Sequence, residues 1–133
     1  MRICVDLDGV ICELRRPEQS YADVAPRPGA VERIRELRAA GHEIVIHTAR
    51  HMKTCGGDVG KVLARQGEVT LAWLREHGID YDEIHFGKPH ADVYLDDNAV
   101  RFESWESVAG DGSSLPVSAE LSRARTSSGE DGP

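Results

Sequence analysis

The sequence lacks the features that mark membrane-spanning, secreted and nucleic-acid-binding proteins. No apolar run approaches the roughly 20 residues that a membrane span needs, and an acidic segment directly after the first residues gives no reason to expect a signal peptide. The cysteines Cys4, Cys12 and Cys55 show no CxxC spacing, so we expect free thiols in a reducing cytoplasm rather than a zinc site. Lys and Arg number 16 against 23 Asp and Glu, a net charge of −7, which argues against nucleic-acid or acidic membrane partners.

What is present is the composition of an ordinary globular domain. The chain has 133 residues, 40% of them hydrophobic and 29% charged, which is enough for one domain with a buried core. The apolar pattern fails beyond about residue 104, where Ser, Gly and acidic residues dominate. We therefore predict one domain over residues 1–105 and a flexible tail over residues 106–133.

Short apolar runs alternate with segments of helical periodicity. In the segment 30–40, for example, Val31, Ile34 and Leu37 recur at helical spacing, and Gly41 provides a stop. Strands that alternate with helices are typical of an α/β fold with a parallel sheet and crossover helices. The pattern predicts strands at 3–5, 43–47, 83–86 and 91–95, and helices at 30–40 and 62–77.

The first strand ends in Asp6-Leu-Asp8-Gly9. Two carboxylates this close repel each other unless a cation or a shared proton intervenes, and Gly9 lets the chain leave the strand through conformations closed to other residues. A strand-end turn that binds nothing is the ordinary alternative.

Other polar residues follow the remaining strands. Thr48 ends the second strand, Lys88 follows the third, and Asp96 and Asp97 follow the run 91–95. The carboxyl ends of parallel strands share one edge of a sheet, where ligands bind. Four carboxylates with a hydroxyl and an ammonium suit Mg²⁺ and a phosphate. Alone, Thr48 is more often a helix cap, and Lys88 a solvated turn lysine.

These motifs, in this order, resemble those of the haloacid dehalogenase-like (HAD) phosphohydrolases. The matching segments are Asp-Leu-Asp-Gly-Val, His-Thr-Ala-Arg, Phe-Gly-Lys-Pro and Tyr-Leu-Asp-Asp-Asn, within residues 1–102, and they are most similar to small phosphatases of capsule and sugar biosynthesis. The resemblance implies a Rossmann-like three-layer α/β/α fold. Many such enzymes insert a cap domain, but residues 10–28 and 49–66 are too short for one. We therefore expect an open site, unless another subunit of a homo-oligomer or the loop 50–67 covers it.

The resemblance also implies roles for individual residues. Asp6 matches the nucleophile and Asp8 the general acid and base, and both match metal ligands together with Asp97 and Asp96, whose order stays open. Lys88 would neutralise the nucleophile and the transferred group. The residues expected to bind substrate are Gly9, Thr48, Ala49, Arg50 and Lys88, and Arg50, His51 and Lys53, which lie just past Thr48, are candidates for substrate contacts.

The expected function is a cytoplasmic, Mg²⁺-dependent phosphomonoesterase of a small phosphate ester, a sugar phosphate above all. A receiver-like signalling domain would carry its phospho-accepting Asp on a middle strand, yet that strand ends in Thr48. A glycosyltransferase would place Asp-x-Asp after a nucleotide-binding unit, not at residue 6. A non-catalytic phosphate-binding relative would be expected to have lost Asp6 or Asp8, and both are present.

Overall fold

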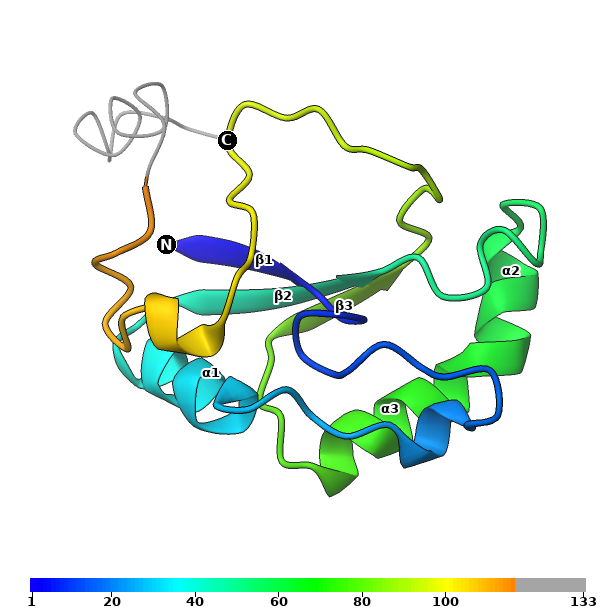
Figure 1. Cartoon of the computed structure of the whole chain (residues 1–133), viewed down its shortest axis with the longest axis horizontal. Coiled ribbons are helices and arrows are strands. Elements are labelled where there is room, and N and C mark those ends of the chain that lie inside the picture. Colours follow the sequence, from blue (N-terminus) through cyan, green and yellow to red (C-terminus); the bar gives the residue numbers. More distant parts are fainter. Residues whose placement is uncertain (117–133) are drawn as a thin grey trace.

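A small parallel β-sheet forms the centre of the computed structural model, which describes residues 1–116 (Figure 1). Its strands are β1 (Arg2–Asp6), β2 (Glu43–Thr48) and β3 (Glu83–Phe86), hydrogen-bonded in the order β1-β2-β3. Both pairings are parallel. The prediction of an α/β fold with a parallel sheet is confirmed.

The helices lie where the sequence periodicity predicts them, within a few residues. Helix α1 (Ala30–Ala39) buries Ala30, Ile34 and Leu37 on one face, because these positions recur at helical spacing. The second helical segment begins earlier than predicted and contains a turn of different geometry. It consists of α2 (Val59–Val62), the π-helical turn η2 (Leu63–Gly67) and α3 (Glu68–Glu76), and the short 3₁₀ turns are η1 (Tyr21–Asp23) and η3 (Trp105–Ser107).

Both main helices cover the same face of the sheet, as Figure 1 shows. Ile34 of α1 and Trp73 of α3 share one hydrophobic core with Val5 and Ile46 of the sheet. Each crossover leads to the next strand in the same direction, and right-handed crossovers then place their helices on one side. Within residues 1–116 the fold therefore has two layers, whereas the resemblance implied a third layer on the other face.

The predicted strand at residues 91–95 is wrong. This segment has no regular structure, and Val93 and Leu95 are 71% and 97% exposed. In Figure 1 it belongs to a wide arc between β3 and η3. An apolar β-branched run favours a strand locally, but a strand also needs a partner edge for its backbone hydrogen bonds. Within the described residues, β1 is therefore an edge strand.

Chain packing continues a short way beyond residue 105. Val108 packs against the core, and the His42 Nε2 atom lies 2.7 Å from the carbonyl oxygen of Asp111. The first residues of the predicted tail thus contact the domain, and residues 117–133 lie outside the described part. No helix within residues 1–116 is long and apolar enough to cross a membrane.

Candidate active site

The turn after β1 holds both carboxylates of the opening motif in a fixed loop. The Leu7 amide donates to Asp6 Oδ1 at 2.9 Å, and the Leu7 carbonyl accepts from the amide of Ile11 at 2.9 Å. Leu7 and Ile11 are fully buried and anchor the loop in the core. Gly9 has a φ of 85°, a conformation that favours glycine. The turn therefore presents Asp6 and Asp8 from a rigid base.

Asp6 and Lys88 are brought together, as the sequence predicted. Lys88 Nζ lies 3.5 Å from Asp6 Oδ2. The Lys88 backbone is held by the end of β2, because its amide donates to the Thr48 carbonyl at 3.1 Å. Burial raises the pKa of the Asp6 carboxyl, and the nearby Lys88 charge opposes that rise. The pair supplies a partly shielded carboxylate with a cation beside it.

Asp8 is held by Arg50. The Arg50 Nε atom lies 3.0 Å from Asp8 Oδ2 and 3.1 Å from Oδ1, and Arg50 Nη2 lies 3.0 Å from Oδ1. The Arg50 side chain is 0% exposed and that of Asp8 25% exposed. Arg50 also donates to Thr70 Oγ1 at 3.1 Å, and its guanidinium lies 4.2 Å from the centre of the Tyr21 ring. Its contacts orient Asp8 rather than face an open substrate site.

Thr48 and the residues after it form the turn at the end of β2. Thr48 is fully buried, and its Oγ1 accepts from the Arg50 amide at 3.1 Å. The Ala49 carbonyl accepts from the Met52 amide at 3.0 Å. Thr48 thus stabilises the turn that carries Arg50 and His51. It ends β2, which pairs with β1. Lys53, proposed as a substrate contact, is exposed in the loop that follows.

The structure does not bring Asp96 and Asp97 to the other carboxylates. Both are exposed, and Asp96 Oδ1 accepts from the Asn98 amide at 3.1 Å in a local turn. Among residues 1–116 no group of three or more His, Cys, Asp or Glu side chains is placed to hold a metal ion. The residue types match the preference of Mg²⁺ for oxygen ligands, but the arrangement seen here does not fit the ion.

Sequence reasoning missed three side chains around Asp8 and Arg50. Tyr21 stacks on the guanidinium, Thr70 accepts from it, and Cys12 Sγ lies 3.4 Å from Asp8 Oδ1. Tyr21 lies in a stretch without periodicity, and Thr70 lies on a helix 20 residues after Arg50. No local pattern links these positions, because their contacts depend on tertiary packing.

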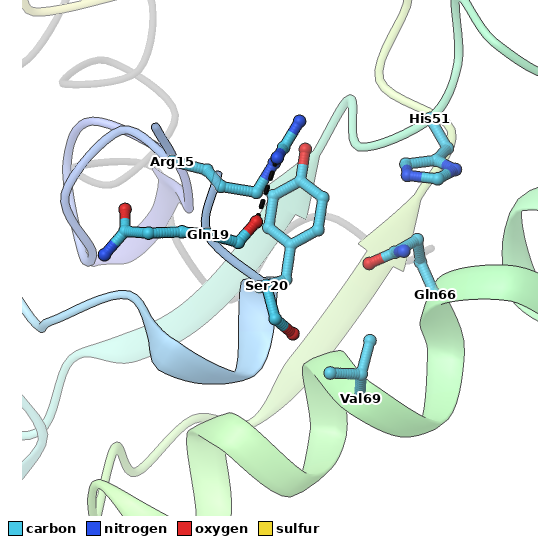
Figure 2. Close-up of a pocket in the computed structure, with 7 residues that line it drawn as sticks. Arg15, Gln19, Ser20, His51, Gln66 and Val69 are labelled. Atoms are coloured by element: carbon cyan, nitrogen blue, oxygen red, sulfur yellow. Dashed lines mark hydrogen bonds between the residues drawn. The ribbon is translucent and has the colours of Figure 1, made fainter. Parts of the chain in front are cut away.

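A cavity of about 440 Å³ opens beside this cluster (Figure 2). One wall consists of Arg15, Gln19, Ser20 and Tyr21, and the other of His51, Gln66 and Val69. Arg15 donates to the carbonyl of Gln19 at 2.9 Å, which braces the first wall. His51 directly follows Arg50, so the cavity borders the loop that orients Asp8.

The chain is similar to a protein of known structure. No protein-family model and no curated protein matches the chain. The crystal structure of an MCSG target from Vibrio cholerae has 35% sequence identity and a TM-score of 0.70, and the match covers 91% of this chain and 93% of the other. The two proteins belong to one family. The two share this α/β fold along most of their length, and the name of the Vibrio cholerae protein states no activity.

Proposed function

We propose that the protein is a phosphomonoesterase that hydrolyses a small phosphorylated metabolite, a sugar phosphate above all, through an aspartyl-phosphate on Asp6. One observation carries this proposal. The Asp6 carboxylate stands at the end of a parallel strand with the Lys88 ammonium 3.5 Å away, and a second carboxylate, Asp8, is fixed two residues later. The resemblance to HAD phosphohydrolases supports the same reading and extends it to an uncapped, HAD-like fold in the cytoplasm.

The two carboxylates divide the chemistry. In the first step an Asp6 oxygen attacks phosphorus, the bond from phosphorus to the ester oxygen breaks, and Asp8, having taken up a proton from solvent, gives it to the departing alcohol. In the second step water attacks the phosphorus of the acyl phosphate and gives a proton to Asp8, which releases inorganic phosphate and restores Asp6. Lys88 offsets the negative charge of the nucleophile and the phosphoryl group throughout.

Mg²⁺ is the cofactor that the residue types favour. When bound, it would reduce the repulsion between the carboxylate and the phosphate. Asp6 and Asp8 would hold it with Asp97 or Asp96, and one of that pair must then approach Asp6 from its exposed position. The steps above depend only on residues of this chain.

The same Asp6–Lys88 pair would also serve a receiver-like domain, in which the acyl phosphate persists as a signal, or a relative that binds phosphate without turnover. The three functions differ in the fate of the phosphoryl group, so one set of measurements separates them.

The test is phosphate release from a panel of sugar and nucleotide phosphates, with and without Mg²⁺. We expect release by the wild type and a loss of kcat on the order of 10³-fold or more in Asp6→Asn, because an amide cannot act as the nucleophile. Asp80→Asn is the matched control, since Asp80 pairs with Arg35 at the surface. Full activity in Asp6→Asn would overturn the nucleophile assignment. A stable acyl phosphate from acetyl phosphate, without ester hydrolysis, would favour the receiver-like function.

A further inference from the structure

The cavity beside Arg50 contains buried polar atoms that have no hydrogen-bond partner. Within residues 1–116 these include Gln66 Oε1 and His51 Nδ1. Gln66 is only 9% exposed, and Figure 2 shows its side-chain oxygen directed toward the space between the two walls. Buried polar groups in native proteins are nearly always paired, and an unpaired one destabilises the fold. Because both atoms are covered from solvent, a ligand would have to press between the two walls to supply the missing partners.

Both residues stand on unusual backbone. His51 has a φ of 58°, which is the left-handed region that non-glycine residues seldom adopt. Gln66 lies in the π-helical turn η2, a geometry that is rare and concentrates at functional sites. Two backbone irregularities thus carry two of the residues that line one cavity. Observed strain of this kind supports a functional role for the residues that carry it.

The lining indicates the chemistry of the ligand. Tyr21 and His51 present tilted rings with centroids 5.9 Å apart, and the lining also contains the Arg15 guanidinium, which donates to the carbonyls of Arg16, Pro17 and Gln19. Gln66 Oε1 requires a donor, whereas His51 Nδ1 donates or accepts according to its tautomer. A hydroxyl group both donates and accepts, so it satisfies either state, and the C–H faces of a sugar ring can pack on an aromatic ring. A volume of about 440 Å³ lies toward the small end of ligand pockets.

The position of the cavity connects it to the proposed reaction. The Tyr21 ring that lines it contacts the Arg50 guanidinium, and Arg50 holds Asp8. Asp8 is the group that would protonate the departing alcohol, so the alcohol must lie on the Asp8 side of the phosphate. We infer that this cavity binds the hydroxyl-rich leaving group of the ester, and that Gln66 and His51 determine specificity for it. This inference rests on the proposed function for its link to catalysis.

Direct binding tests the cavity without any turnover. Unphosphorylated monosaccharides and, separately, nucleosides are titrated into the wild type and Asp6→Asn while the Gln66 side-chain amide and the His51 ring are followed by NMR. We expect sugars to shift both signals in both proteins. Gln66→Met should weaken sugar binding about tenfold or more, because it removes the acceptor at similar volume. It should not lower Tm, because it also removes an unpaired buried oxygen.

Leu63→Met is the matched control: Leu63 lies in the same π-helical turn, is 47% exposed and does not line the cavity. Its sugar affinity should equal that of the wild type. The inference is overturned if no sugar shifts the two signals, if nucleosides bind better than sugars, or if Gln66→Met lowers Tm and leaves binding intact. Phosphate release by the wild type from p-nitrophenyl phosphate reports on the proposed function separately. Sugar binding without any ester hydrolysis would contradict the proposed phosphatase activity but would still support the sugar-binding site.

Discussion

At the scale of single residues, Arg50 has the most consequential set of contacts. Its guanidinium is fully buried, yet it meets a carboxylate, a hydroxyl and an aromatic ring. A buried ion pair adds little net stability, because both charges lose water, but removing one partner leaves an uncompensated charge. Arg50 therefore fixes the orientation of Asp8 and makes the two residues dependent on each other.

We expect Arg50→Met to lower the free energy of unfolding by roughly 2–4 kcal/mol, somewhat less than for a fully buried pair, because Asp8 keeps some access to water. Urea denaturation measures this value. Arg50→Lys should recover only part of it, since an ammonium cannot reproduce the planar fork and the stacking on Tyr21. Adding Asp8→Asn to Arg50→Met should cost less than the sum of the single changes. Strict additivity would contradict the coupling.

At the scale of elements, the helical segment from α2 to α3 contains a glycine, Gly67, at a position where alanine should be more stable. Gly67 has ordinary helical angles, φ −59° and ψ −54°, and an added Cβ would meet only Leu63 Cδ2 at 3.8 Å. Gly67→Ala should therefore raise the free energy of unfolding by about 0.5–1 kcal/mol, because alanine loses less conformational entropy in a helix. Chemical denaturation provides the measurement.

Gly87→Ala is the opposite case. Gly87 has a φ of 98°, and a Cβ there would lie 2.9 Å from Val59 Cγ2. This substitution should destabilise the protein by more than about 1 kcal/mol. Equal effects at the two glycines would mean that backbone conformation does not decide the outcome.

The elements also show what a sequence can and cannot predict. The spacing of Val31, Ile34 and Leu37 identifies α1, because apolar residues that recur every three or four positions form the buried face of a helix. The run 91–95 has equally good local strand character but pairs with no strand within residues 1–116, since nothing in its own residues specifies a partner edge. The same limit applies to the site. Asp6, Thr48 and Lys88 follow from their places at strand ends, whereas the contacts of Arg50 with Tyr21 and Thr70 follow only from packing between distant segments.

At the scale of the whole molecule, two features bear on the metal proposal: the edge of β1, which is unpaired within residues 1–116, and the exposed segment 91–97. Mg²⁺ held by Asp6 requires Asp97 or Asp96 to move toward β1, and that movement would bring residues 91–95 to the free edge. Hydrogen exchange should then slow at the amides of 91–95 when Mg²⁺ and inorganic phosphate are added together. The double variant Asp96→Asn/Asp97→Asn should show no slowing. Unchanged exchange in the wild type would contradict a metal site that includes these residues.

The face of the sheet opposite the helices carries a network of charges that joins all three strands. Arg2 of β1 lies 2.8 Å from Glu43 of β2 and 2.9 Å from Glu83 of β3, and His85 contacts Glu83 at 3.0 Å. The hydrogen bond from Arg2, reinforced by His85, lowers the pKa of Glu83 from 4.5 to about 2. The folded state thus favours the ionised carboxylate, so its stabilising effect is present above pH 4.5 and is lost as the pH falls toward about 2.

As the pH falls from 4.5 to about 2, the Tm of Glu83→Gln should therefore decrease less than the Tm of the wild type. The two curves of Tm against pH should converge near the lower pH. The measurement is Tm against pH, recorded at low and high salt. Because these side chains are solvent-exposed, added salt should shrink the difference between the two proteins. Parallel curves for wild type and Glu83→Gln through the interval would show that the cross-strand network does not contribute to the acid sensitivity of the fold.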